Sequence, residues 1–396
     1  MILQSQHGFR CRRSCLTNIL EFLEDITNSV DCQKGVDVIF LDFQKAFDKV
    51  PHCRLLVKLR SLGITGSVLA WIHTWLTDRK QRVVLKGCRS SWCNVASGVP
   101  QGSVLGPLLF ISYINDIDAS VLSNVLKFAD DTKLYREVSS CDDATMLQAD
   151  LNNVFDWSQL WQMPFNVSKC KIMHIGSKNP CIPMSLNGTE LTTVSVEKDL
   201  GFYLDSSLKP SRQCVEAAKK GNRVLGMIRR NFKFLHRDTV LRLYKQLVRP
   251  HLEYAVQAWN PCYSKDSDVL EKVQRRATRL IGTLNRVSYP ERLRVLSLST
   301  LKLRRQRGDL IQVFKIVHGY DCLSFDSFFK LSDCTRTRGH CFKLQSNLCR
   351  TNIRQHFFSQ RIINEWNKLP ESVVKAQSVN SFKNAIDKYY NNCDLL

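Results

Sequence analysis

The chain has 396 residues, 44% hydrophobic and 23% charged, which excludes a largely disordered protein. This length exceeds what one compact core needs, so we expect two or three domains. The net charge of +21 is uneven, because residues 1–200 carry 21 Lys+Arg against 20 Asp+Glu, whereas residues 201–396 carry 36 against 16. A polyanion would relieve this self-repulsion, so nucleic acid is the expected partner; the alternative is a basic surface without one.

No apolar run reaches the ~18 residues that cross a membrane, and no apolar segment follows Met1 as in a secretory signal. We therefore expect a protein of the nucleus or cytoplasm, not secreted, with no membrane partner. Its 16 cysteines are expected to be reduced thiols. Cys334, His340, Cys341 and Cys349 could hold zinc, but their spacing fits no standard zinc finger, which favours the reading without a metal.

Hydrophobic periodicity predicts a mixed first half and a helical second half. Helices are expected over residues 17–29, 54–62, 66–76, 103–117 and 142–161, the last capped by Asp142 or Asp143. Strands are expected over residues 36–43, 82–86, 92–96, 125–128, 133–136, 171–175 and 200–204, with 82–86 paired to 92–96 around Gly87. The basic helices are expected over residues 215–232, 238–259, 268–284 and 301–317.

Two apolar runs end in carboxylates. Asp42 follows a buried-looking strand, and Asp130-Asp131 lie at the tip of the expected hairpin. Adjacent aspartates in a turn are usually solvated, but a carboxylate after an apolar strand is costly unless a cation neutralises it. Together the three would suit a pair of Mg²⁺ ions, which serve in-line phosphoryl transfer.

A loop rich in glycine and proline lies between these segments, over residues 97–107. Such a loop lets the backbone approach a ligand before a helix begins. By itself the loop indicates only the start of a helix. Its position between the two aspartate segments favours the interpretation that it contacts a ligand.

Four motifs run in this order along the chain: Gln6-His7-Gly8-Phe9-Arg10, Phe40-Leu41-Asp42-Phe43-Gln44-Lys45-Ala46-Phe47-Asp48, Gly98-Val99-Pro100-Gln101-Gly102-Ser103 and Phe128-Ala129-Asp130-Asp131. In these motifs and their order the chain resembles the reverse transcriptase of non-long-terminal-repeat (LINE-type) retrotransposons, most closely the jockey branch. Later segments also fit, among them Trp161-Gln162-Met163-Pro164-Phe165, Lys198-Asp199-Leu200-Gly201, Arg249-Pro250-His251-Leu252 and Gln274-Arg275-Arg276.

The resemblance implies a role for each matching residue. Asp42, Asp130 and Asp131 would be catalytic and, with the Phe43 carbonyl, would hold two Mg²⁺ ions, or Mn²⁺ in their place. Phe47 would stack under the incoming sugar, Gln101 and Gly102 would lie against nucleotide and template, and Lys169 would protonate the leaving pyrophosphate. Phe128, Ala129, Leu200 and Gly201 would lie near the primer. The duplex phosphates would be bound by Arg275, Arg276, Arg279, Arg304, Arg305 and Arg307. Asp48 is expected to be structural.

The implied fold is α+β: a right-hand polymerase with an antiparallel palm sheet and a basic all-α thumb. Residues 1–35 would be partial fingers, 36–204 the palm, 205–300 the helical thumb and 301–396 a basic C-terminal helical region. The partners would be an RNA template, a DNA primer and deoxynucleotides. The family has further fingers and an endonuclease domain before the first motif, so we expect an N-terminally truncated copy. The alternative function is a catalytically inactive remnant that acts only as a basic nucleic-acid-binding protein.

Overall fold

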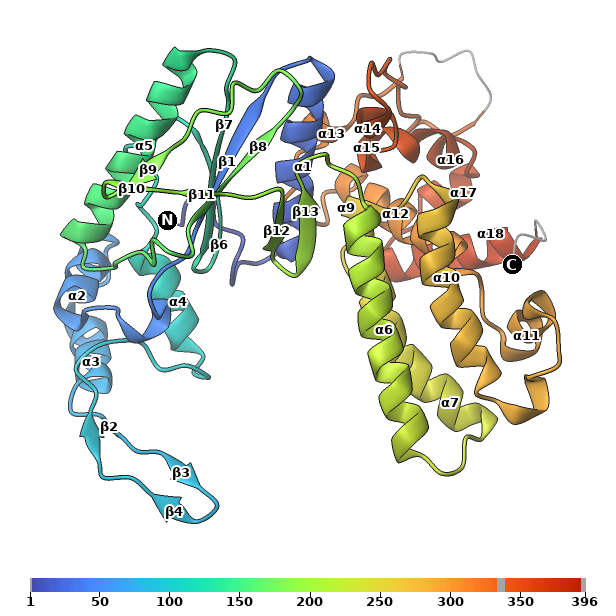
Figure 1. Cartoon of the computed structure of the whole chain (residues 1–396), viewed down its shortest axis with the longest axis horizontal. Coiled ribbons are helices and arrows are strands. Elements are labelled where there is room, and N and C mark those ends of the chain that lie inside the picture. The colour runs from blue at the N-terminus through green and yellow to red at the C-terminus, as the bar shows by residue number, and fades with distance from the viewer. Residues whose placement is uncertain (1, 333–338, 393–396) are drawn as a thin grey trace. The chain divides into compact units, whose positions relative to one another are not determined.

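The computed structural model describes residues 2–332 and 339–392, which fall into two compact units. Unit 1 comprises the residues up to 18 together with residues 33–195, and unit 2 comprises residues 19–32 and the described residues from 196 onward. Unit 1 combines a sheet with helices, and unit 2 is mostly helical (Figure 1). The expected α+β class is therefore confirmed.

The centre of unit 1 is a five-stranded sheet in the order β11-β8-β1-β7-β6. The strands are β1 (Val36–Leu41), β6 (Asn124–Phe128), β7 (Asp131–Glu137), β8 (Lys171–Ile175) and β11 (Thr192–Thr193). All pairs are antiparallel except β11 with β8. The central strand β1 is almost wholly buried, as its nearly continuous apolar sequence, interrupted by Asp37, predicts for a strand covered on both faces.

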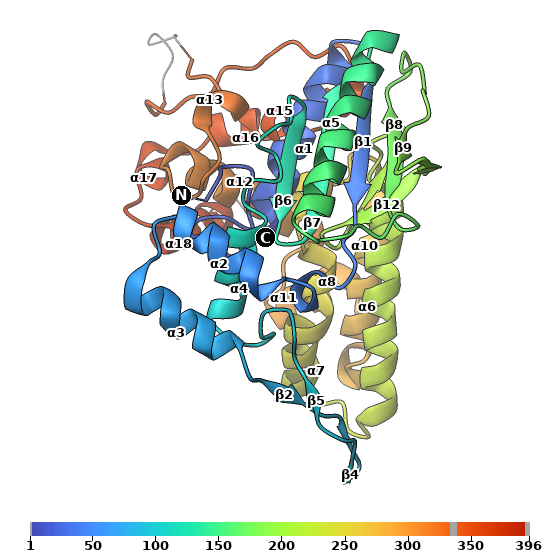
Figure 2. The same ribbon diagram turned by 90° about the vertical axis from the view of Figure 1, so that its left-hand side faces the viewer.

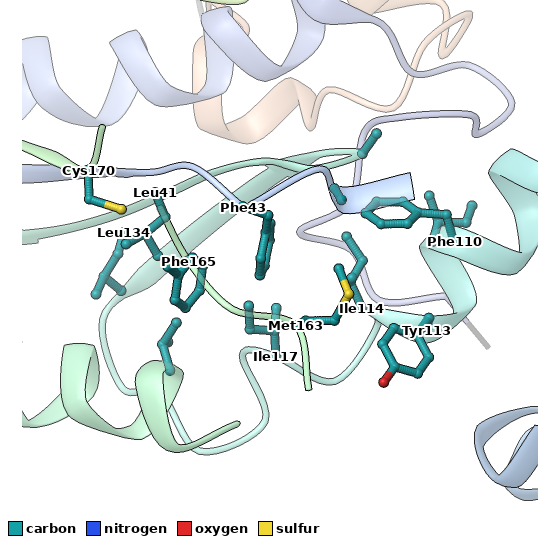
Figure 3. Packing of buried hydrophobic residues seen from close by; sticks show 14 of the residues in the cluster. Leu41, Phe43, Phe110, Tyr113, Ile114, Ile117, Leu134, Met163, Phe165 and Cys170 are labelled. Atoms are coloured by element: carbon teal, nitrogen blue, oxygen red, sulfur yellow. The ribbon is translucent and has the colours of Figure 1, made fainter. Parts of the chain in front are cut away.

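Helix α5 (Cys141–Leu160) packs on β7 of this sheet. Helix α2 (His52–Ser61) packs on α3 (Gly66–Leu76) and α4 (Leu105–Tyr113), and a short 3₁₀ turn, η1 (Ala46–Asp48), follows β1. Leu41 and Phe43 of the β1 segment, Phe110 of α4 and Phe165 lie in the same apolar core (Figure 3). This core supports the strand ends and loops that carry the predicted site.

Lys58 of α2 is buried inside a ring of aromatic side chains. Its Nζ lies 3.9 Å from the ring centre of Trp161 and 4.4 Å from that of Trp157, and it forms an ion pair with Asp116. It also donates to the Tyr113 carbonyl at 2.5 Å. Burial lowers the pKa of Lys58 to about 8, although Asp116 opposes this shift. Lys58 thus ties α2 to the ends of α4 and α5.

A narrow two-stranded ribbon of unit 1 projects from the chain between α3 and α4 (Figures 1 and 2). Its paired segments are β2 (Lys80–Gln81) with β5 (Cys93–Asn94) and β3 (Val84–Leu85) with β4 (Cys88–Arg89). The expected pairing of 82–86 with 92–96 is wrong, because a tight turn at Gly87 pairs Leu85 with Cys88 directly. A second hairpin, β9 (Ser185–Leu186) with β10 (Thr189–Glu190), was not expected.

Helix α1 (Cys15–Asp31) begins in unit 1, and its residues from Ile19 onward belong to unit 2. There Glu24 forms a buried ion pair with Arg354. Unit 2 also holds a hairpin of β12 (Val196–Asp199) and β13 (Phe202–Asp205). Its longer helices are α6 (Ser211–Asn231), α7 (Arg237–Leu243), α10 (Ser264–Arg279), α11 (Tyr289–Leu296), α12 (Leu301–Val317) and α18 (Val379–Asn392). Its shorter ones are α8 (Arg249–Glu253), α9 (Val256–Trp259), α13 (Phe325–Phe328), α14 (Asn352–Gln355), α15 (Phe358–Arg361), α16 (Ile363–Asn367) and α17 (Glu371–Val374).

Three sequence expectations about helices are corrected. The helix expected over 238–259 is broken, because a π-helical stretch (Tyr244–Val248) precedes Pro250 and Ala255 adopts a positive φ of 49°. The helix expected over 268–284 begins earlier and ends at Arg279, with a 3₁₀ turn (Gly282–Leu284) after it. Ser140, not Asp142 or Asp143, is the N-cap of α5, and Asp143 completes its capping box.

In the part of the chain that the structure describes, no helix is long and apolar enough to span a membrane. Of the possible zinc ligands, Cys334 lies outside the described residues. His340 is buried and its Nε2 lies 3.1 Å from the Trp366 carbonyl oxygen.

We predict that the stability of the protein relative to its Lys58→Met variant rises with pH. Between pH 8 and 10.5 the unfolded chain keeps the Lys58 proton that the folded chain has lost, so the unfolded state binds more protons and raising the pH favours folding. From pH 7 to pH 9.5 this relative gain should be about 2 kcal/mol, measured by urea unfolding under reducing conditions. An unchanged difference would show that Lys58 titrates normally.

Candidate functional site

The pairing of β1 with β7 brings the predicted aspartates to one end of the sheet. Leu41 is paired with Thr132, so the same register continued by one residue sets Asp42 opposite Asp131. The next pairing, β6 with β7, closes at Phe128 and Asp131, which leaves Ala129 and Asp130 as the two turn residues. Asp42, Asp130 and Asp131 therefore share one end of the sheet, and Asp131 is the most exposed of the three.

Asp42 occupies a partly buried position beside Lys169. Its Oδ2 atom is buried without a hydrogen bond and lies 3.4 Å from Nζ of Lys169. Its carbonyl oxygen accepts a hydrogen bond from the Asn166 amide at 2.7 Å. The Cys170 thiol lies 3.5 Å from the Asp42 amide nitrogen, and burial raises the pKa of this thiol to about 11, so it stays neutral. Asp42 thus has one cationic neighbour and an oxygen available for another.

Burial raises the pKa of Asp130, and the negative charge of Asp42 raises it further. A hydrogen bond from its own backbone acts in the opposite direction. The strand registers set Asp42 and Asp130 at the same end of the sheet, so the two negative charges repel each other. A cation between them would remove that repulsion.

The N-terminal segment around Gln6 holds the turn of Asp130 in place. The buried Gln6 side chain accepts hydrogen bonds through Oε1 from the backbone amides of Ala129 at 2.9 Å and Gly8 at 2.7 Å. The His7 amide donates to the Lys127 carbonyl, and the Lys127 amide donates to the Ser5 carbonyl, both at 2.8 Å.

This contact leaves no room for a side chain at Gly8, where a Cβ would lie 2.4 Å from the Ala129 nitrogen. Ala129 itself adopts a positive φ of 55°, which is unfavourable for a residue with a Cβ. Gln6 therefore stabilises a strained turn that directs Asp130 toward Asp42. The sequence shows neither the burial of Gln6 nor its partner Ala129, more than 120 residues away.

Phe47 and the loop before α4 are joined by backbone contacts. Phe47 stacks on Phe110 of α4, with ring centres 4.3 Å apart, and its carbonyl accepts from the Val99 amide at 2.8 Å. Gly98 adopts φ +91°, and a Cβ there would lie 2.6 Å from the Asp48 carbonyl oxygen. Gln101 donates through Nε2 to the Asp48 carboxylate at 3.3 Å. The Asp48 carboxylate thus contacts this loop, and Gly102 lies in the same loop.

The oxygen ligands near Asp42 fit a hard divalent cation. The carboxylates of Asp42 and Asp130 form the kind of donor set that Mg²⁺ prefers, and the Oδ2 atom of Asp42 is buried without a hydrogen bond. The bridge between Phe43 and Phe165 uses Asp42 and Gln44 for its backbone hydrogen bonds, so these bonds do not involve the Phe43 carbonyl. Among the described residues no three acidic, histidine or cysteine side chains converge as a preformed metal cage.

The other predicted contacts to nucleic acid lie in unit 2. Leu200 and Gly201 form the turn between β12 and β13, where the Leu200 carbonyl accepts from the Tyr254 hydroxyl at 2.7 Å. Arg275, Arg276 and Arg279 are exposed on α10.

The expectation that three arginines of α12 bind phosphates is corrected. Arg305 is 1% exposed and donates to Asn260 and Ser267, so it cannot reach a ligand in solution. Arg304 forms an ion pair with Glu253, and Arg307 with Asp387 at 2.6 Å. These charges stabilise the helical unit, because each guanidinium is paired or buried within it.

Comparison with known proteins agrees with this geometry. Residues 1–235 match the family described as reverse transcriptase (RNA-dependent DNA polymerase). A probable RNA-directed DNA polymerase from transposon X-element of Drosophila melanogaster is 27% identical over 298 residues, and an RNA-directed DNA polymerase from mobile element jockey of Drosophila funebris is 28% identical over 296. Each match covers 70% of this chain and 32% of the relative, so the chain spans about a third of the length of these curated relatives.

Among solved structures, apo telomerase from Candida tropicalis aligns with a TM-score of 0.39 at 12% identity, covering 71% of this chain and 47% of that one. Telomerase from Candida albicans in complex with a fragment of telomeric RNA aligns with a TM-score of 0.38 at 11% identity, covering 68% of this chain and 52% of that one.

We predict that Gln6→Leu loosens the Asp130 turn. The change leaves two buried backbone amides without an acceptor, which costs about 2–4 kcal/mol of unfolding free energy. Hydrogen exchange at the Ala129 amide should accelerate, and urea unfolding should report the lost stability. The matched control is Gln81→Leu, at an exposed position on the ribbon, which should change neither measurement. Equal protection of Ala129 in both variants would contradict the role of Gln6.

Proposed function

Because the chain belongs to the reverse transcriptase (RNA-dependent DNA polymerase) family, we propose that it is the polymerase part of a non-LTR retrotransposon protein. The reaction would add deoxynucleotides to the 3′-hydroxyl of a DNA primer, with RNA as template and pyrophosphate as the leaving product. The cellular location would be the nucleus or the cytoplasm. The RNA template, the DNA primer and the deoxynucleotides are the proposed partners.

The observation that carries this proposal is the closeness of Asp42 and Asp130 at one end of the sheet. Two like charges in a partly buried place are unfavourable unless a cation binds between them. Asp42, Asp130, Asp131 and the Phe43 carbonyl would hold two Mg²⁺ ions, or Mn²⁺. When bound, these ions would neutralise the charge that develops on the attacking and leaving oxygens.

Lys169 would assist the leaving group. Its ammonium lies 3.4 Å from Asp42 Oδ2 and its side chain is 66% exposed, so it can reach an anion next to the carboxylates. As the primer oxygen bonds to the α-phosphorus, the bond to pyrophosphate breaks, and Lys169 would donate a proton to the departing oxygen. This step needs a positioned acid, not a bare positive charge.

Phe47 and the Gly98–Gly102 loop would line the nucleotide site. Phe47 is fixed by its stacking on Phe110, so its ring would form a rigid floor under the sugar and exclude a 2′-hydroxyl. Gln101 and Gly102 would lie against nucleotide and template, and Phe128 and Ala129 near the primer end. Rigid contacts of this kind suit phosphoryl transfer, which depends on positioning.

The two units would correspond to parts of a right-hand polymerase. Partial fingers would occupy residues 1–35, the palm residues 36–204, the thumb residues 205–300 and a basic C-terminal region residues 301–396. Leu200 and Gly201 would form a primer grip. Arg275, Arg276 and Arg279, which are exposed on α10, would bind duplex phosphates without reading sequence.

We predict that primer extension depends on both carboxylates. With a poly-adenosine template, an oligo-thymidine primer and Mg²⁺, Asp130→Asn and Asp42→Asn should each lower the rate by about 10³-fold, because each loses charge stabilisation worth several kcal/mol. The control Asp156→Asn removes an exposed carboxylate of α5 and should leave the rate unchanged. Duplex binding without extension by the unmodified chain would instead favour the inactive binding remnant.

We predict that Lys169→Arg and Lys169→Ala both lose primer-extension activity. Both should lower extension by about 10²-fold, because arginine keeps the positive charge beside Asp42 but does not release a proton near neutral pH. Single-turnover rates measured across pH 6–9 would separate the two roles. Full activity of Lys169→Arg would show that the residue acts only through its charge.

A further inference from the structure

The ribbon that leaves unit 1 after α3 is strongly basic, and none of the site residues described above lies on it. Over residues 79–95 it carries Arg79, Lys80, Arg82, Lys86 and Arg89, and it has no Asp or Glu. These five side chains form no ion pair within the described part of the chain, so their charge is uncompensated. The segment, here called the basic ribbon, extends away from α2 and α3 in both views (Figures 1 and 2).

The basic ribbon also exposes large apolar and aromatic side chains. Val83 and Leu85 are each 70% exposed, and Trp92 is 59% exposed. The Arg82 guanidinium lies 4.4 Å from the centre of the Trp92 ring, which fixes the ring while leaving part of its surface open. A two-stranded ribbon this short gains nothing from exposing such groups unless a ligand covers them.

An open groove of about 820 Å³ lies at the root of the ribbon. Thr77, Ala96 and Ser97 join it to the ribbon strands, and Lys49 and Arg54 contribute positive charge. Lys49 donates to the Gln44 side-chain oxygen and Arg54 to the Leu160 carbonyl, so both bind neutral partners and keep their charge. His52 and His73 complete the basic lining, and no carboxylate lines the groove.

We propose that the basic ribbon and this groove together bind a single strand of nucleic acid. Five uncompensated cations would follow the phosphates, and an exposed tryptophan held by arginine would stack on a base, the combination that single-strand binding uses. A duplex fits less well, because its bases are already stacked and cannot cover Trp92.

In the reaction, this strand would be the RNA template before it pairs. That identity rests on the proposed function, but the binding itself does not. The strand would run from Trp92 along the ribbon into the groove, whose wall at Ser97 adjoins Gly98 and the loop that would contact the template.

The test measures binding of fluorescein-labelled oligo-uridine and oligo-thymidine 20-mers by anisotropy, without divalent metal or nucleotides. Trp92→Ala should weaken binding about tenfold, and Trp92→Phe should restore most of it. Trp71→Ala is the matched control, because Trp71 is a 55% exposed tryptophan of unit 1 outside the ribbon, and it should bind as the unmodified chain does. Loss with both oligomers indicates a general single-strand site; loss with RNA alone indicates selection of RNA.

The charge contribution is measured separately. Arg79→Gln, Arg82→Gln and Arg89→Gln combined should reduce the slope of log affinity against log salt by about 2, whereas the three Arg→Lys changes should preserve it. Photo-crosslinking of 4-thiouridine RNA followed by mass spectrometry should label peptides within residues 79–95. Crosslinks confined to other peptides, with unaltered affinity of Trp92→Ala, would overturn the proposal and leave the ribbon as a protein contact.

Failure of the proposed function gives a different result. Asp130→Ala should bind both oligomers as the unmodified chain does, because Asp130 lies outside the ribbon and the groove. If primer extension is absent while the Trp92 and arginine effects remain, the single-strand site stands and the polymerase assignment fails. If primer extension is present but the ribbon variants bind the oligomers normally, the polymerase assignment stands and the single-strand site fails.

Discussion

The register between β1 and β7 sets two strand ends with negative charge side by side, and much of unit 1 serves to hold them there. Asp42 and Asp130 repel each other, yet their backbones are fixed by hydrogen bonds to Asn166, Gln6 and neighbouring strands. The positive φ of Ala129 adds strain to the same turn. The apolar core beneath the sheet stabilises the fold against this repulsion and strain, because it keeps the strands in register (Figure 3).

The parts that sequence predicted well are those governed by local pattern. A nearly continuous apolar run predicts the central strand β1, and the hairpin expected around Asp130 is formed by β6 and β7. Its turn consists of Ala129 and Asp130, whereas Asp131, expected at the tip, begins β7. The parts that it missed depend on distant partners. Nothing near Gln6 shows that its side-chain oxygen accepts from the Ala129 amide, and nothing near Arg305 shows that its guanidinium donates to Asn260 and Ser267.

The positive charge of the second half therefore has two different physical meanings. Arg304, Arg305 and Arg307 are paired or buried, and an ion pair such as Arg361 with Asp309 lies in the interior of unit 2. Such groups contribute specificity and stability to the fold, because leaving either partner alone would be costly. Only exposed side chains, such as Arg275 and Arg279, remain for a polyanion. Net charge alone overstates the surface that nucleic acid can use.

The carboxylates also bear on the choice between an enzyme and a binding remnant. A buried oxygen of Asp42 makes no hydrogen bond, and Asp130 is partly desolvated next to a like charge. Each of these features lowers stability. The Lys169 ammonium, 3.4 Å from that Asp42 oxygen, offsets part of the first cost, and a hydrogen bond to Asp130 from its own backbone offsets part of the second. Nucleic-acid binding through exposed arginines would gain nothing from this arrangement. A divalent cation bound by both carboxylates would offset both costs at once, which is the physical reason for proposing a cation site here rather than a binding function alone.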